Sequence, residues 1–244
     1  MEPKETNQML KNMGEFADAQ EHMVQWGIPF EVLFKSKFSL FFFSFFFSHY
    51  LLSFQELKNS RLVLDVGCGM GLPTKVLQSM GLSAKFIGVD VYRDYLRRVK
   101  SSGLYDDCIL ASAENLPFKA GSFDSAMCLQ VLEHLSREDG DLVLKFLCDV
   151  AATVVLTTPV GFVENGVDSA NAFQDHKSGW YPCDLRALGF RVRGYGGLGV
   201  GRLVDFKAFM VFNGFFVPLV IYFPAFAFHM FAVRKRRDKV GMQH

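Results

Sequence analysis

The sequence predicts an α/β fold built around a mostly parallel sheet, and three observations lead to that prediction. Short apolar runs alternate with amphipathic stretches between residues 61 and 200, as strands and helices do around a parallel sheet. The first of these runs leads directly into three glycines at alternate positions, and the second ends in an aspartate. Two of the amphipathic stretches begin and end at residues that favour helix termini.

The apolar runs locate the strands. We predict six of them before the C-terminal region, at Leu62–Val66, Lys85–Asp90, Cys108–Ser112, Ser125–Leu129, Thr153–Thr157 and Phe190–Tyr195.

Two helices have recognisable ends. The segment from Ser136 to Asp139 resembles a capping box, and the spacing after it predicts one apolar face, made of Leu142, Val143, Phe146 and Leu147. A second helix is expected from Pro182, which suits a first turn, to Gly189, which suits a C-cap.

Composition narrows the class of protein. The chain has 244 residues and a formal net charge of +1, which predicts a single α/β domain without a basic field, so nucleic acid is not expected as a partner. The polar N-terminus lacks a secretory signal, which predicts an intracellular protein, cytoplasmic or membrane-associated. No C-x-x-C pair or histidine cluster stands out, so no metal is expected, and a reducing compartment is indicated by five scattered cysteines: Cys68, Cys108, Cys128, Cys148 and Cys183.

The glycine turn is the strongest sign of a ligand. Gly67, Gly69 and Gly71 follow the first strand directly, and glycines there let backbone N–H groups approach a ligand closely. A tight turn without a ligand is the alternative. Asp90 ends the next strand about 20 residues later, where a carboxylate can accept both hydroxyls of a ribose. A dinucleotide fingerprint would need a further glycine where Leu72 stands, so a nicotinamide cofactor is the weaker interpretation.

The region between Arg61 and Tyr195 resembles the class I S-adenosylmethionine-dependent methyltransferases, in the broad group of small-molecule enzymes of the type 11 kind. The resemblance rests on four segments: Asp65–Gly71 as the first motif, Val89–Asp90 as the ribose acid, Ala113–Phe118 as the adenine segment, and Ser122–Asp124 with Val131–Leu135 as the fourth strand and its exit.

This resemblance implies a Rossmann-like sheet of seven strands, with helices on both faces and an antiparallel last strand. It implies S-adenosylmethionine as the cofactor, with the glycines under the methionine part, Asp65 near its ammonium and Asp90 on the ribose. The implied cofactor-binding residues are Asp65, Gly67, Cys68, Gly69, Gly71, Asp90, Val91, Ser112, Ala113, Glu114 and Leu129. The family commonly has an aspartate where this chain has Ser112, so restoring it is expected to tighten binding.

Few residues are needed for methyl transfer beyond those that align the reactants and remove a proton. His134 and His176 are the candidates for a base, although a lone histidine is often structural. Glu133 would anchor the strand exit, and Trp180 would form a pocket wall or fill the core. The expected function is methyl transfer to a small, lipophilic acceptor; the alternatives are a noncatalytic cofactor-binding or membrane-attached protein and an NAD-dependent oxidoreductase.

Two apolar segments stand apart from this pattern. The segment Phe38–Phe54 forms either an apolar helix or an insertion that comes from noncoding sequence. The segment Phe209–Val233 either spans a bilayer, with basic residues after it, or forms a lid followed by the last strand at Ala225–Val233. Both segments predict membrane contact. The chain is accordingly divided into an N-terminal segment (1–60), a methyltransferase core (61–200) and a C-terminal segment (201–244).

Overall fold

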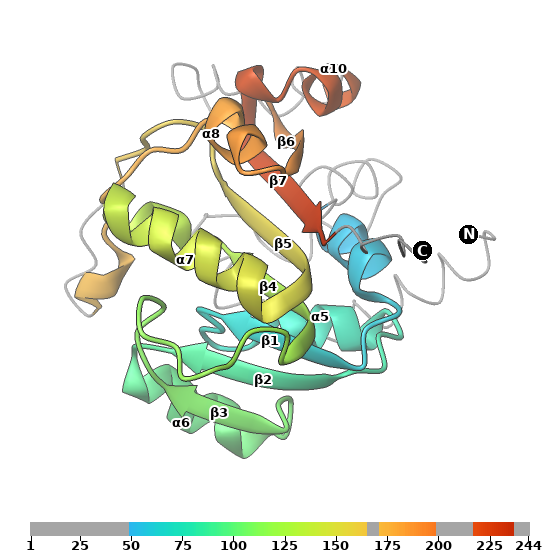
Figure 1. The fold of residues 1–244 in the computed structure, drawn as a ribbon, viewed down its shortest axis with the longest axis vertical. Helices are drawn as coiled ribbons and strands as arrows, with labels where there is room; N and C mark the ends of the chain where they lie inside the picture. Colours follow the sequence, from blue (N-terminus) through green and yellow to red (C-terminus); the bar gives the residue numbers. More distant parts are fainter. Residues whose placement is uncertain (1–48, 165–170, 199–216, 237–244) are drawn as a thin grey trace, which may run out of the picture.

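The computed structural model describes residues 49–164, 171–198 and 217–236, and its centre is one sheet of seven strands in the order β3-β2-β1-β4-β5-β7-β6 (Figure 1). Strands β1 to β5 pair in parallel, whereas β7 is antiparallel to both β5 and β6. This arrangement confirms the predicted fold class. The strands are β1 Leu62–Val66, β2 Lys85–Asp90, β3 Asp107–Leu110, β4 Phe123–Leu129, β5 Ala151–Pro159, β6 Arg191–Leu198 and β7 Ala227–Lys235.

Helices cover both faces of the sheet, and Figure 1 shows the longest of them, α7, lying over β4 and β5. A helix of residues 49–57 precedes β1. The others are α5 Leu72–Ser79, α6 Arg93–Ser102, α7 Arg137–Val150, α8 Pro182–Ala187 and α10 Val217–Tyr222, with short 3₁₀ turns η1 Leu132–His134, η2 Ala172–Gln174 and η5 Pro224–Phe226.

The two cores follow from the alternation of side chains along each strand. In β5, Val154 and Leu156 pack with α7 and α8 on one face, whereas Val155 packs on the other face, in the core that contains α5 and α6. Successive strand residues point to opposite faces. Runs of consecutive apolar residues therefore supply both layers at once, as expected of a parallel sheet buried on both sides.

The predicted strands agree with the observed ones to within a few residues at their ends. The last strand begins at Ala227 and not at Ala225, because Pro224 starts the turn η5. The predicted face of α7 is partly wrong: Leu142 is 56 % exposed, and Leu144 is buried in its place. The cap is as expected, since Oγ of Ser136 accepts the N–H of Asp139 at 3.1 Å.

The apolar segments behave differently from a pair of spanning helices. Residues 217–233 form α10, η5 and most of β7, so the interpretation of Phe209–Val233 as one spanning helix is wrong for these residues, while 209–216 lie outside the described part. Of Phe38–Phe54, only residues 49–54 are described, and they are helical. Among the described residues, no helix is both long enough and apolar enough to cross a membrane.

Trp180 couples the loop before α8 to α7 through Gly140. The indole is fully buried, the guanidinium of Arg137 lies 3.9 Å from its ring centre, and its Nε1 donates to the carbonyl of Leu132 at 3.2 Å. A Cβ atom on Gly140 would lie 2.3 Å from Cζ2 of this ring. Of the two interpretations of Trp180, the pocket wall is therefore wrong, because its ring fills the core.

We predict that Gly140→Ala destabilises the chain. Alanine gains about 1 kcal/mol of helix propensity, but forcing a methyl group against a ring held by hydrogen bonds costs about 1–3 kcal/mol. The clash should win, and thermal unfolding should begin a few degrees lower, at about 2–4 °C per kcal/mol. The matched control is Lys145→Ala on the exposed side of α7, which should change stability by less than about 0.5 kcal/mol. A Gly140→Ala protein as stable as the parent would contradict this packing.

Candidate functional site

The predicted site residues gather at one edge of the sheet, where the parallel strands end. The segments after β1, β2, β3 and β4 all leave from this edge, and the chain turns from β1 toward β2 but from β4 toward β5. The crevice between β1 and β4 is thus a switch point of the topology, the place where open α/β sheets bind ligands.

The glycine turn after β1 is shaped by positive φ angles and by a close neighbour. Gly67, Gly69 and Gly71 have φ of 71°, 52° and 79°, a region that side chains disfavour. A Cβ on Gly67 would lie 2.3 Å from Cγ2 of Val131, in the segment after β4. A Cβ on Gly69, by contrast, would meet no atom within 4 Å. Gly67 is therefore needed for packing, and Gly69 leaves backbone open to a ligand.

Asp90 holds the turn in place from the end of β2. Its Oδ2 accepts the N–H of Gly69 at 2.8 Å, and its Oδ1 accepts the N–H of Tyr92 at the same distance. Burial raises the pKa of this carboxyl, and the backbone donors oppose the rise. Because a carboxylate has about four lone-pair positions, Asp90 can still accept hydrogen bonds from a ligand.

Asp65 lies beneath the turn and not on its open side. It is 1 % exposed, and its Oδ2 accepts from Oγ1 of Thr74 at 2.9 Å and from the hydroxyl of Tyr105 at 2.6 Å. Burial raises the pKa of Asp65 to about 7, although both hydroxyl donors act to lower it. Asp65 thereby connects β1 to α5 and to the segment before β3. Its predicted contact with an ammonium group stays a prediction.

A carboxylate lies beside the position where the family commonly has an aspartate. The hydroxyl of Ser112 donates to Oε2 of Glu114, which is exposed after β3. Of the other predicted cofactor residues, Cys68 is buried, Val91 is exposed, and Ala113 and Leu129 are half-buried. Ser112 is therefore paired with a negative charge two residues away, which the sequence comparison with the family did not anticipate.

The exit from β4 carries a strained residue and a buried acid. Gln130 has φ of 57°, the one positive φ among the described residues that are not glycine. With its amide oxygen toward the N–H of Thr158, its nitrogen donates to Oε1 of Glu133 at 3.2 Å. Glu133 is 2 % exposed and also accepts from Oγ1 of Thr158 at 3.0 Å, and burial raises its pKa to about 8.

The loop before α8 is bound to this exit through the backbone. The N–H groups of Lys177 and Ser178 donate to the carbonyl of Glu133 at 2.7 and 3.1 Å. These bonds place His176 against His134, with ring centres 4.8 Å apart and planes inclined by 71°. Two residues 42 positions apart in the sequence are in this way brought to one point of the site.

The backbone selects the tautomer of both histidines. Nδ1 of His134 lies 3.3 Å from the carbonyl oxygen of Asp175, and Nδ1 of His176 lies 2.6 Å from that of Val163. A carbonyl oxygen only accepts, so Nδ1 must carry the proton in each ring and Nε2 keeps its lone pair. Burial, followed by the charge of His176, lowers the pKa of His134.

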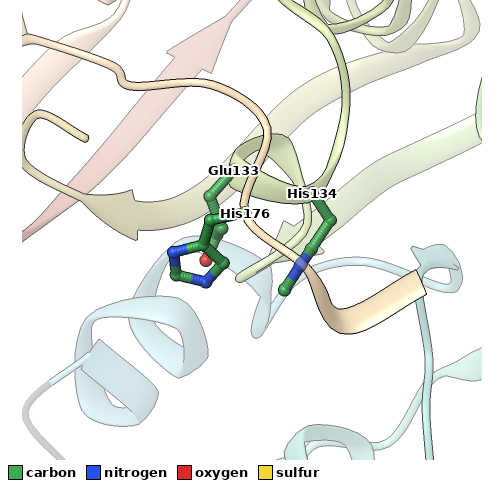
Figure 2. Close-up of side chains that lie close together, drawn as sticks. All are labelled: Glu133, His134 and His176. Carbon is green, nitrogen blue, oxygen red and sulfur yellow. The ribbon is translucent and has the colours of Figure 1, made fainter. Parts of the chain in front are cut away.

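Figure 2 shows the carboxylate of Glu133 next to the imidazole of His176, with His134 beside them. One ligand atom from each of these three residues lies within 4.8 Å of the others. The premise that the histidines supply no cluster is therefore wrong, because the fold joins residues that sequence spacing kept apart. Sequence reasoning also missed Thr74, Tyr105 and Gln130.

The central part of the chain matches known methyltransferases. Residues 64–152 match the model of a methyltransferase domain family. The 18S rRNA (guanine(1575)-N(7))-methyltransferase of Saccharomyces cerevisiae is 32 % identical over 85 residues, which cover 34 % of this chain and 30 % of the yeast protein. The ubiquinone biosynthesis O-methyltransferase of Xanthomonas axonopodis pv. citri is 35 % identical over 78 residues, or 30 % and 32 % of the two chains. The chain thus spans about a third of the length of these curated relatives.

The expectation that nucleic acid is not a partner is wrong. The yeast relative, which matches this chain at the level just given, is a methyltransferase of 18S rRNA. Net charge cannot support such an expectation, because it averages the whole surface, whereas a substrate meets only the charges around the site. The relatives include methyltransferases of rRNA, of tRNA and of ubiquinone biosynthesis, so they do not confirm the expected small-molecule acceptor.

Solved structures share the fold. A SAM-dependent methyltransferase from Archaeoglobus fulgidus superposes with a TM-score of 0.52 at 19 % identity, covering 82 % of this chain and all of that one. Three features of the chain agree with this fold. They are the strand order with an antiparallel β7, the glycine turn held by Asp90, and the match to a methyltransferase domain. Residues 64–152 therefore match a methyltransferase domain, and the described part of the chain has the fold of a SAM-dependent methyltransferase structure.

Proposed function

We propose that this chain is an enzyme that transfers a methyl group from S-adenosylmethionine to an acceptor with a lipophilic part. The observation that carries the proposal is the glycine turn, held to Asp90 by the N–H of Gly69 at 2.8 Å, at the switch point of the sheet. The cofactor supplies a methyl group on a positively charged sulfur, which is already a good leaving group. What is left to the protein is binding, alignment and the removal of a proton.

The cofactor side of the site follows the order of the strands. Gly69 offers open backbone for the methionine part, Asp90 has acceptor capacity for the ribose hydroxyls, and Glu114 with Ser112 supplies polar atoms for the adenine. The full set proposed for the cofactor is Asp65, Gly67, Cys68, Gly69, Gly71, Asp90, Val91, Ser112, Ala113, Glu114 and Leu129. Within it, Asp65 and Gly67 support the turn from below.

The acceptor side comprises His134 and His176. Their unprotonated Nε2 atoms can take a proton from an acceptor hydroxyl or amine as the methyl group is transferred. His134 suits this role because burial favours its neutral form. Both rings are oriented by backbone carbonyls, so neither has to reorganise before the reaction.

An exposed apolar surface supports a lipophilic acceptor. It consists of α10 and the turn after it, which contact β6, a strand that ends at the same edge as the site. Its exposed side chains are Leu219, Ile221, Tyr222, Phe223 and Phe226. Large exposed apolar surfaces commonly bind ligands or partners. An acceptor screen should include quinol precursors and RNA side by side, since relatives of both kinds exist.

Cofactor binding is the first prediction. S-adenosylhomocysteine should bind the full chain, and Asp90→Asn should weaken it about 10- to 100-fold, because hydrogen bonds to a charged acceptor contribute about 1.5–3 kcal/mol. Isothermal titration calorimetry measures both affinities. Asp94→Asn, an exposed acid of α6, is the matched control and should bind as the parent does. Binding of NAD in place of the homocysteine nucleoside would contradict the proposal.

A second prediction concerns the adenine side. Glu114→Gln should weaken S-adenosylhomocysteine by about 3- to 10-fold, because the amide is a weaker partner than the carboxylate for the Ser112 hydroxyl and for an amino group. Glu138→Gln in the first turn of α7 is the control. Equal affinities for the parent and Glu114→Gln would place the adenine elsewhere.

A third prediction follows from the buried Asp65. Its pKa is about 7 in the folded chain and near 4 when unfolded. The stability that comes with its neutral form is present below pH 4 and is lost as the pH rises through 7, by at most about 4 kcal/mol. Relative to the parent, Asp65→Asn should therefore gain stability between pH 5 and pH 8. Urea unfolding of both proteins at the two pH values measures the difference, and a constant difference would show that Asp65 ionises normally.

A further inference from the structure

The cluster of Glu133, His134 and His176 has the donor set of a metal centre. We propose that it binds one divalent ion of the first transition series, and that the ion's open positions take a hydroxyl oxygen of the methyl acceptor. The second half of this proposal rests on the proposed function, whereas the first half stands on the cluster alone. A metal ion would use the same lone pairs as a proton, so this assignment replaces the role of the two histidines as bases.

The two histidine rings are oriented in the way that is common for metal-binding histidines. In each ring Nδ1–H donates to a backbone carbonyl, of Asp175 for His134 and of Val163 for His176, which leaves Nε2 as the free donor. Such an outer hydrogen bond sets the tautomer and the ring orientation of metal-binding histidines. Glu133 and His134 lie in η1, and His176 lies in the loop whose backbone donates hydrogen bonds to η1. These hydrogen bonds hold the three ligands in fixed positions relative to one another.

The charges around the cluster favour a cation. Glu133 is a buried carboxylate whose partners are the neutral donors of Thr158 and Gln130, and it forms no salt bridge with any residue in the described part of the chain. Oδ1 of Asp175, the residue that precedes His176, is buried and has no hydrogen-bond partner among the described residues. Buried charges are normally paired or bound to a metal. The ionised form of Glu133 would therefore need a positive partner, and no described residue forms an ion pair with it.

The ligands must move toward one another to bind an ion. Ligand nitrogens and oxygens lie about 2.0–2.2 Å from an ion such as Zn²⁺, so two of them in a tetrahedral site are about 3.3–3.6 Å apart. The ligand atoms of the cluster lie within 4.8 Å, a difference that side-chain rotation can close. Two imidazoles and one carboxylate favour transition metals, whereas Mg²⁺ and Ca²⁺ prefer oxygen ligands. Three protein ligands also leave positions open, as in catalytic sites.

The cluster of Glu133, His134 and His176 lies next to the glycine turn, where a bound ion could activate the methyl acceptor. Val131, two residues before Glu133, contacts the glycine turn at Gly67, so the cluster adjoins the cofactor side of the site. An ion there would lower the pKa of a coordinated hydroxyl, whose proton leaves to water. The coordinated oxygen would then form a bond to the methyl carbon while the carbon–sulfur bond breaks. The electron pair of the broken bond would stay on sulfur. The products are a methyl ether and S-adenosylhomocysteine, with no oxidant or reductant required.

Cobalt(II) is the probe, because its visible absorption reports bound nitrogen ligands. The untagged full chain, stripped with chelator, should bind one Co²⁺ and develop visible bands, and Mg²⁺ in large excess should not displace it. Glu133→Gln and His176→Asn should each weaken Co²⁺ by more than about 100-fold, because even outer-shell changes cost 10- to 100-fold. Glu138→Gln, on the exposed side of α7, should bind as the parent does. Circular dichroism checks that each variant folds.

A second titration tests the open position. Adding catechol to the Co²⁺-loaded chain should shift the bands to a spectrum unlike that of free cobalt catecholate, whereas 1,2-dimethoxybenzene, which lacks the hydroxyls, should not. No shift with catechol would overturn the acceptor-oxygen assignment.

The outcomes separate the two proposals. Absence of Co²⁺ binding in a chain that binds S-adenosylhomocysteine would overturn the metal site and leave the methyltransferase proposal standing. Equal Co²⁺ affinity in the parent and both variants, or displacement by Mg²⁺, would also overturn the site as assigned. A chain that binds Co²⁺ through these residues but not S-adenosylhomocysteine would keep the metal centre and remove the proposed function.

Discussion

The contact between Gly67 and Val131 is the constraint on which the site depends. It presses the glycine turn after β1 against the exit of β4, so closely that a single Cβ would lie 2.3 Å from the valine side chain. The turn forms the proposed cofactor side, and the exit leads within three residues to Glu133 and His134 on the acceptor side. Methyl transfer requires the two reactants in line and nearly in contact. A glycine at this position therefore determines how near the two halves of the site can come.

Two buried carboxylates give the site its electrostatic character. Asp65 under the turn and Glu133 at the exit both have pKa values raised by burial, to about 7 and about 8. Each receives hydrogen bonds from neutral donors of the neighbouring strands and helices. Burying such groups destabilises the fold unless a positive charge is nearby. The proposed ligands, a sulfonium cofactor with an ammonium group and a divalent cation, are both positive, so binding would offset a cost that the free chain carries.

Much of the fold followed from local pattern. The strands β1 and β2 were predicted to the residue because each is an apolar run bounded by a turn signal, and α7 began where its capping serine stands. Glycine spacing and Asp90 located the cofactor side because those residues are close together along the chain. Errors came where packing decides: Leu142 and Leu144 are adjacent leucines, and the rotation of α7 against the sheet chose which one is buried.

The sequence by itself determined the fold class, the glycine turn, the aspartate that holds it and the resemblance to methyltransferases, because each rests on a local pattern along the chain. Only the tertiary structure decided that Trp180 fills the core, that Asp65 is covered by Thr74 and Tyr105, and that His176 meets Glu133 and His134. Such contacts join segments tens of residues apart, and their geometry depends on how loops dock against strand ends. No local spacing encodes that docking, so the sequence named His134 and His176 as candidates but did not place them next to each other or to Glu133.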